Sequence, residues 1–377
     1  MTRDDTLNDL TRHLETGRLT RREFVMRALA LGVSVSAVGT VLSACGGDEG
    51  GGGGGGGEQV TLAFVSWGGT FQEAQTKAWL DPYSKEFTNV KFVQDEPTDY
   101  AKIKAMVESG NVTWDVVDIG NDFGLGASSV KLCEKLDPAV IPFDELQPDK
   151  LLTSGYRVPV HVYSTVVGYV PEKTGGVAPT GFADFFDLSK FPGKRGAYNW
   201  VMGGLLEMAL IADGVTLENL YPLDTDRAYK KIDTVKDQIV WWDTGAQSVQ
   251  LLTDGEVTMG MSWNNRIVTA KEEGAAEDIM WDQHIMMADY VMIPKGSKQV
   301  AEAMKFIGWI TSADHAADLS KYVASGPGNE LAIPKTDPKY AADIPTAHLD
   351  GAIPQDDVYW GENYDKLDPD WQNWVQA

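Results

Sequence analysis

An unbroken run of eight glycines, Gly50 to Gly57, divides this chain into a short leader and a long body. Each glycine has much backbone freedom to lose and no side chain to bury, so such a run forms no packed element. Only the part of the chain that follows the run is long enough to build domains. The glycine run therefore predicts a folded body that is carried on a flexible linker.

The leader has the features of an export signal. Residues 20–25, TRREFV, resemble a twin-arginine signal, and the weakly apolar stretch 28–41 is too short to span a bilayer. Residues 42–45, LSAC, resemble a bacterial lipobox, in which signal peptidase cuts before the cysteine and the thiol carries lipid. A chance N-terminal helix would have to reproduce all three features in the same order.

These features predict where the protein works. We expect a twin-arginine lipoprotein signal peptide at residues 1–44 and a glycine-rich linker at 45–58. Lipid on Cys45 would anchor the body to the outer face of the cytoplasmic membrane, in the periplasmic space. After residue 45 the sequence offers no long uncharged apolar run that would cross a membrane.

The acidic charge of the body limits its partners. The whole chain has a formal net charge of −23, and residues 1–44 contribute six Arg against five Asp or Glu, which leaves −24 for the body. Such a surface argues against nucleic acid and anionic lipid as partners. Because acidic surfaces also serve solubility, the charge by itself identifies no ligand.

Strand and helix patterns alternate along the body. Residues 60–65 and 114–119 are typical of buried strands, and helical spacing follows each of the strand candidates 60–65 and 90–93. Later, 239–242 and 257–261 are strand candidates, and 245–253 and 300–310 have helical periodicity. Alternation of this kind indicates a mainly parallel sheet with helices on its faces. Ligands of such folds lie beyond the carboxyl ends of the strands, here near residues 66–70 and 120–123.

At these junctions the chain resembles the spermidine/putrescine-type substrate-binding proteins of ABC importers, an extracellular solute-binding family. The resemblance rests on the order and spacing of several short segments, none of which is specific by itself. They are Trp67 at the end of the first strand, WDVVD at 114–118, FADFFD at 182–187, EMAL at 207–210, GEV at 255–257, GMSWN at 260–264 and IPKG at 293–296.

The resemblance implies an α/β, two-lobe, periplasmic-binding-protein-like fold of type II. Each lobe would be a mainly parallel sheet flanked by helices, with the ligand in a cleft between the lobes. By resemblance, lobe 1 comprises 59–165 plus 264–311 and lobe 2 comprises 166–263 plus 312–377. The chain would cross between them near 160–168, 262–264 and 311. Hinge closure would trap the ligand, and the closed form would dock on an ABC permease in the membrane. We expect a monomer.

Tryptophans and their neighbours at strand ends are candidate ligand contacts. The resemblance places Trp67, with Thr70 beyond it, and Trp263 on the two sides of the cleft, because loops follow both strands directly. An indole face covers an aliphatic chain and attracts an ammonium, at roughly 0.5–2 kcal/mol per contact. Trp200 and Trp242 are further candidates. The alternative for each is burial in the core, since most of the twelve tryptophans have to be buried.

A cationic amine needs carboxylates. Asp289 matches a family aspartate before the 293–294 strand end, and Asp122 and Glu207 are further candidates, with surface solvation as the alternative. Polyamine-binding members of the family carry acids just before the helix that matches 207–210. Here that stretch, 200–204, contains none. The departure weakens the expectation of a polyamine such as putrescine or spermidine.

Other residues favour an anionic or polar end of the ligand. Arg266 follows Trp263, Asn264 and Asn265, where a guanidinium would pair with a carboxylate; a salt bridge within the protein is the alternative. Gln247 lies at the start of the 245–253 helix, whose N-terminus suits an anion. By resemblance, Asn264 and Asn329 would also contact ligand. Aromatic walls with one arginine and one or two acids suit a small zwitterion such as 4-aminobutyrate.

Other classes of function are weaker matches. The histidines at 161, 284, 315 and 348 are scattered, and no catalytic or metal-binding motif joins them, so we expect no enzyme, no catalytic residue, no cofactor and no metal. Sugar binding stays open, because tryptophans with Asp or Asn side chains also serve hydroxyls. A lipoprotein that senses a ligand for a membrane receptor would have the same sequence features.

Overall fold

The computed structural model describes residues 59–146 and 154–377. The predicted signal peptide, Cys45 and the linker to residue 58 lie outside the described residues. The body, Glu58 to Ala377, forms one compact unit.

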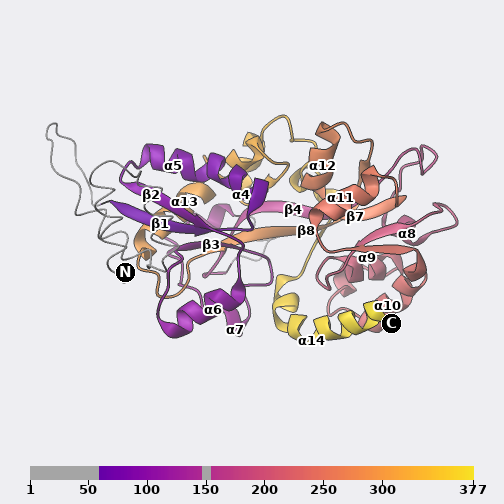
Figure 1. Cartoon of the computed structure of the whole chain (residues 1–377), viewed down its shortest axis with the longest axis horizontal. Coiled ribbons are helices and arrows are strands. Elements are labelled where there is room, and N and C mark those ends of the chain that lie inside the picture. The colour runs from indigo at the N-terminus through magenta and orange to yellow at the C-terminus, as the bar shows by residue number, and fades with distance from the viewer. Residues whose placement is uncertain (1–58, 147–153) are drawn as a thin grey trace, which may run out of the picture. The chain divides into compact units, whose positions relative to one another are not determined.

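The described residues contain one ten-stranded mixed sheet (Figure 1). The main order is β2-β1-β3-β8-β4-β7-β5-β6, with β10 beside β8 and β9 beside β4. The strands are β1 (Val60–Val65), β2 (Val90–Asp95), β3 (Val116–Ile119), β4 (Val158–Tyr169), β5 (Arg195–Tyr198), β6 (Ile239–Trp242), β7 (Met259–Trp263), β8 (Asp278–Met292), β9 (Gly326–Pro327) and β10 (Ala352–Pro354).

Helices cover both faces of the sheet (Figure 1). The α-helices are α4 (Gly69–Gln75), α5 (Asp81–Glu86), α6 (Tyr100–Ser109), α7 (Ala127–Val130), α8 (Phe182–Phe186), α9 (Leu205–Ala212), α10 (Thr225–Asp233), α11 (Gly245–Thr253), α12 (Asn264–Glu272), α13 (Val300–Thr311) and α14 (Asp357–Gln376). The π-helix η1 (Thr76–Leu80) joins α4 to α5, and the 3-10 segments are η2 (Phe143–Glu145), η3 (Leu217–Asn219), η4 (Lys236–Gln238), η5 (Asp318–Lys321), η6 (Glu330–Lys335), η7 (Pro345–Ala347) and η8 (Leu349–Gly351).

Local sequence patterns predicted most of these elements. The strands expected at 60–65 and 239–242 and the helix at 245–253 have the bounds that the periodicity indicated, because strand and helix periods are local properties. The predicted α/β class is confirmed. The final helix, α14, has 20 residues.

The sheet has a parallel part at each end and an antiparallel middle. Strands β2, β1 and β3 are mutually parallel, as are β6, β5 and β7. The two long strands β8 and β4 lie between them, and they pair antiparallel with each other and with β3 and β7. Each of the two long strands therefore has residues in both parts of the sheet.

Separate hydrophobic clusters stabilise the two parts. Around β1 and β3, Phe64, Trp79 and Phe306 belong to one buried cluster, and another cluster lies against α6. Around β5 and β7, Trp360 and Trp371 of α14 belong to the largest cluster, and a further one lies against α11 and α12. Two parts with their own cores are the arrangement that a two-lobed protein requires.

The connection between the two parts differs from the expectation at one place. Strand β4 covers the predicted first crossing, 160–168. Residues 262–264, where the resemblance implies a crossing, join β7 to α12, and α12 packs against β7 and α11. Apolar packing holds α12 in this position, because its Ile267 and Val268 belong to one buried cluster with Leu252 and Val257. The chain continues into the other part through β8.

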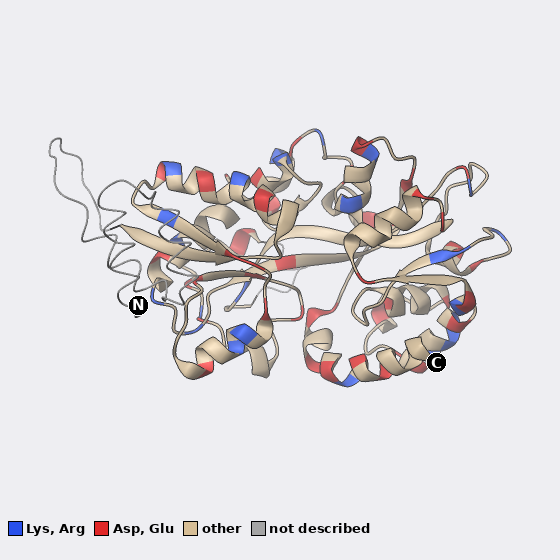
Figure 2. Cartoon of the chain, viewed as in Figure 1, with Lys and Arg blue, Asp and Glu red and all other residues tan. Residues whose placement is uncertain are grey.

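Charges cover the outside of both parts. Asp and Glu are spread over the surface helices and outnumber Lys and Arg along α14 (Figure 2). Within the described residues, no helix has the length and apolar character needed to cross a bilayer.

Candidate functional site

Strand β4 places a row of side chains on one face of the sheet. His161, Tyr163 and Thr165 alternate along the strand and so share that face. His161 is the register partner of Asp289 on β8, and Thr165 is the partner of Trp263 on β7. At about 3.3 Å per residue, the row is roughly 13 Å long. It connects a predicted acid in one part of the sheet to a predicted tryptophan in the other.

One end of the row is a cluster around Asp289. The indole Nε1 of Trp67 donates a hydrogen bond to Asp289 Oδ2 at 3.0 Å, and His161 Nε2 lies 3.0 Å from the same oxygen. The His161 ring lies between those of Phe71 and Tyr163, with centroids at 4.8 and 5.3 Å. Asp289 is almost buried, whereas Trp67 is 39% exposed. The predicted residues Trp67 and Asp289 are therefore directly bonded.

A second carboxylate, Asp118, lies behind this cluster. It is fully buried, and its Oδ2 accepts hydrogen bonds from Ser66 Oγ at 3.0 Å and Gln75 Nε2 at 2.5 Å. Burial, followed by the nearby charge of Asp289, raises the pKa of Asp118 well above its usual value. Sequence reasoning missed Asp118, although an acid inside the apolar strand β3 was an available signal.

The other end of the row is aromatic. The ring of Trp263 meets the rings of Tyr198 and Trp242 edge to face, with centroids at 5.6 and 5.8 Å. Tyr198 in turn stacks on Trp242, with centroids 4.2 Å apart and planes 6° from parallel. Trp242 is only 1% exposed, so it supports the cluster from behind. Tyr198 was missed by sequence reasoning, although it is the last residue of a strand.

Arg266 lies beside this aromatic end, in the first turn of α12. A Cβ atom on Gly245, the first residue of α11, would be 3.1 Å from Arg266 Nε and 2.7 Å from the Trp263 ring. The glycine thus permits the close approach of α11 to both side chains. Burial lowers the pKa of Arg266. Among the described residues no carboxylate forms an ion pair with Arg266, so the alternative of an internal salt bridge finds no partner there.

Several predicted polar residues are bonded within the protein. Asn264 is fully buried, and its amide bonds to three backbone groups. The amide of Asn329, also buried, bonds to two backbone groups and one carboxylate. Gln247 forms the capping box of α11 with Thr244. These side chains have packing and capping partners where the sequence suggested ligand contacts.

Glu207 is likewise placed inside the protein. It is fully buried, and its Oε1 accepts hydrogen bonds from Tyr221 Oη at 2.8 Å, Trp360 Nε1 at 2.8 Å and Gln355 Nε2 at 3.1 Å. Burial raises the pKa of this carboxyl group. Glu207 therefore links α9 to the segment that leads into α14.

The remaining predicted residues lie at the margins of the row. Thr70 is exposed in the first turn of α4. Asp122 is half-buried; its Oδ1 accepts a hydrogen bond from Tyr100 Oη at 2.8 Å, and burial raises its pKa. Trp200 donates from Nε1 to Tyr364 Oη at 3.3 Å.

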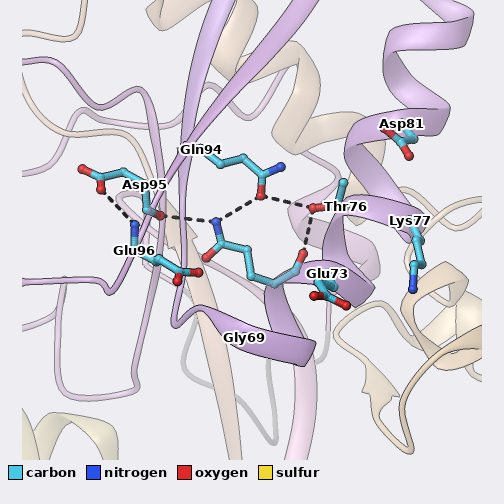
Figure 3. A pocket seen from close by; sticks show the side chains of 9 residues that line it. Gly69, Glu73, Thr76, Lys77, Asp81, Gln94, Asp95 and Glu96 are labelled. Carbon is cyan, nitrogen blue, oxygen red and sulfur yellow. Dashed lines mark hydrogen bonds between the residues drawn. The ribbon is translucent and has the colours of Figure 1, made fainter. Parts of the chain in front are cut away.

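Two surface cavities lie outside this arrangement. One, of about 580 Å³, is lined by residues of α4, η1 and the end of β2, where Gln72 Nε2 donates to Gln94 Oε1 at 3.1 Å and to the Asp95 carbonyl at 3.3 Å (Figure 3). The other, of about 310 Å³, lies between α9 and α10. None of the twelve predicted ligand residues lines either cavity. The described residues also contain no group of three or more His, Cys, Asp or Glu placed to hold a metal ion.

Comparisons with known proteins agree with this architecture. The family model for bacterial extracellular solute-binding proteins matches residues 78–365. The gamma-aminobutyric acid-binding protein of Pseudomonas aeruginosa is 33% identical over 323 residues, which are 84% of this chain and 91% of that protein. The spermidine/putrescine-binding periplasmic protein of Escherichia coli is 22% identical over 297 residues, 75% of this chain and 82% of that protein. The solved structure of a GABA receptor superposes with a TM-score of 0.78 at 42% identity, covering 84% of this chain and 98% of that chain.

Proposed function

The chain belongs to the bacterial extracellular solute-binding protein family, and from that premise we propose that it captures a small ω-amino acid for uptake by an ABC importer. The observation that carries the proposal is the separation of opposite charges along β4. Asp289 lies at one end of the row and Arg266 beside the other. A solute with an ammonium and a carboxylate at its two ends complements the signs of these charges, and closure of the two parts would bring the ends of the roughly 13 Å row together around a small ω-amino acid.

The acidic end would bind the ammonium group. Both bonds to Asp289 use Oδ2, so among the described contacts Oδ1 is not engaged. An ammonium bound there would also meet the partly exposed ring of Trp67, whose face attracts cations. Such pairing offsets the several kcal/mol that removing an amine from water would cost.

The basic end would bind the carboxylate. Arg266 has no carboxylate partner in the described part of the chain, and its guanidinium can form two parallel hydrogen bonds with one carboxylate. The first turns of α11 and α12 flank it, and helix N-termini favour anions. Trp263 and Tyr198 would cover the aliphatic middle of the solute.

A polyamine fits this arrangement less well. A diamine would bring a second ammonium toward Arg266, and like charges at that distance repel. The loop 200–204 offers no acid to compensate. The relative that binds spermidine and putrescine shares 22% of its residues with this chain, whereas the gamma-aminobutyric acid-binding relative shares 33%.

Calorimetry of the purified protein tests the proposal. We expect 4-aminobutyrate to bind with measurable heat and to be recovered unchanged, because a transport component releases its solute without chemistry. Putrescine and spermidine serve as the comparison. Heat from either polyamine, with none from 4-aminobutyrate and related amino acids, would reject the zwitterion in favour of a polyamine.

Replacing Trp263 should weaken binding without unfolding the protein. Because the indole covers the solute at the aromatic end, Trp263→Ala is expected to reduce the affinity for 4-aminobutyrate by about 1–3 kcal/mol. Trp309→Ala provides a matched control, since Trp309 of α13 stacks on His315, away from the row. An unchanged dissociation constant for Trp263→Ala would remove Trp263 from the site.

The two-lobe organisation remains part of the proposal. The predicted division was 59–165 plus 264–311 against 166–263 plus 312–377. We propose one change, that α12 moves with the second lobe, because it packs against α11 and β7. Bending of β4 and β8, which contribute to both parts of the sheet, would then open and close the site. Small-angle scattering with and without ligand tests this closure.

The route and anchoring of the protein are also proposals. We propose twin-arginine export, lipid on Cys45 and a monomeric body that presents its solute to the membrane permease. The sequence features of the leader support the first two. Incorporation of labelled palmitate into the membrane-associated protein tests the anchor, and absence of label would contradict it.

A further inference from the structure

Helix α14 is fixed to both parts of the sheet. At the start of α14, Asp357 Oδ2 lies 2.6 Å from Nη2 of Arg157, a residue of the turn that precedes β4. A Cβ atom on Gly126 would be 3.0 Å from the carbonyl oxygen of Gly361, so the first turns also press against the 121–126 loop. Further along, Trp360 and Trp371 are fully buried in the core around β5 and β7. Helix α14 therefore begins beside the part of the sheet that contains β3 and continues along the part that contains β5 and β7 (Figure 1).

Tyr364 lies on this helix one turn after Trp360, and it meets the aromatic wall of the proposed site. Its hydroxyl accepts the hydrogen bond from Trp200 Nε1 at 3.3 Å, and the two ring centroids are 6.4 Å apart. Trp200 is in turn 5.7 Å from Tyr198, which contacts Trp263. A continuous series of aromatic contacts thus joins Tyr364 to the ring beside Arg266.

Burial raises the pKa of three tyrosine hydroxyls near this series of aromatic contacts, those of Tyr163, Tyr198 and Tyr364. Burial raises the pKa of Tyr163 well above its usual value, with further contributions from Asp289, Tyr198 and Asp122. Burial raises the pKa of Tyr198 to about 12, with Asp243 and Tyr364 contributing. These tyrosines belong to β4, β5 and α14, and the contacts of Trp200 with Tyr198 and Tyr364 connect the C-terminal helix to β5.

The Tyr364 hydroxyl is also available as a donor. A phenol hydroxyl both donates and accepts, and the indole of Trp200 uses only its oxygen. Among the described residues no acceptor takes the hydroxyl hydrogen. Burial raises the pKa of Tyr364; the bond from Trp200 lowers it, and the charges of Asp368 and Asp122 raise it again. The group therefore stays a neutral donor at neutral pH.

We propose that the C-terminal helix is a third component of the binding site and that the Tyr364 hydroxyl donates a hydrogen bond to an acceptor oxygen of the bound solute. The inference rests on the proposed function, because it takes the row along β4 as the site. It makes Tyr364 a specificity-determining residue that selects for solutes with an oxygen at the aromatic end.

Removing the hydroxyl alone tests the inference. Tyr364→Phe keeps the ring and its packing, and it is expected to raise the dissociation constant for 4-aminobutyrate about tenfold, the usual loss for a hydrogen bond to a charged group. Tyr359→Phe is the matched control on the same helix, since its ring packs at a tilt against Tyr221, with the centroids 5.1 Å apart, and it should leave the constant unchanged. Both variants should melt within a few degrees of the unmutated protein without ligand.

The outcomes separate this inference from the proposed function. If the unmutated protein binds 4-aminobutyrate and Tyr364→Phe binds it equally well, Tyr364 does not contact the solute and the inference fails alone. If the unmutated protein gives no heat with 4-aminobutyrate, the proposed function fails. The melting temperatures of the same two variants are then measured with the amine, amino acid or sugar that stabilises the unmutated protein. An equal rise in melting temperature in both variants overturns the role of Tyr364.

Discussion

Arg266→Ala is expected to reduce the affinity for 4-aminobutyrate by at least about 100-fold, or about 3 kcal/mol, which would be the largest binding effect of any substitution in this protein. The Arg266 side chain is exposed and lies beside Trp263 and the start of α11, without a carboxylate of its own among the described residues. Its loss would leave the solute carboxylate desolvated and unpaired. Isothermal titration at neutral pH measures the change.

Two further variants make the Arg266 result specific. Arg266→Lys keeps the charge but loses the paired hydrogen bonds, so it should recover only part of the affinity. Arg227→Ala removes an exposed arginine that is paired with Asp213, and it should leave the affinity unaltered. For a polyamine ligand, Arg266→Ala would be neutral or favourable, so tighter binding of putrescine by this variant would contradict the zwitterion.

Asp357→Ala is expected to lower the free energy of unfolding by about 3–5 kcal/mol, because it breaks a buried ion pair with Arg157. Arg157 is fully buried; it donates to the carbonyls of Asn121 and Phe123 and lies 3.7 Å from the centroid of the Tyr290 ring. Urea denaturation at neutral pH measures the loss.

An exposed ion pair provides the comparison for Asp357. Lys194 and Glu256 lie 3.6 Å apart with about half of each side chain exposed. Glu256→Ala should therefore change the free energy of unfolding by less than about 1 kcal/mol. Equal losses in the Asp357 and Glu256 variants would show that burial of the Arg157 pair does not determine stability.

The sequence predicted the local elements of the fold better than their long-range pairing. Strands such as 239–242 and helices such as 245–253 follow from periodicity within a few residues. The insertion of β8 between β3 and β4 depends on contacts across more than 100 residues, which no local pattern records. The crossing between the two parts of the sheet at 262–264 was expected by resemblance. In the structure these residues lead into α12.

Sequence reasoning could select candidate residues where the residue type strongly favours one kind of contact. Trp67 and Trp263 were chosen because they follow or end strands, Arg266 because it follows Trp263, and Asp289 by resemblance. In the structure Trp67 bonds to Asp289, and Arg266 lies close to Trp263 at the start of α11. Asn264, Asn329 and Gln247 were not separable from structural residues, because amides serve backbone groups as readily as ligands. Tyr163, Tyr198 and Tyr364 were missed because only the tertiary fold brings three distant elements together.

The position of β8 has a consequence for how the protein is made. Strands β3 and β4 do not pair with each other, since each pairs with the late strand β8. While the ribosome has yet to deliver residues 278–292, both strands keep an open edge, and open edges invite aggregation. Asp289 is itself on β8, so a nascent chain acquires this carboxylate of the proposed site and covers the open edges of β3 and β4 in the same step of synthesis.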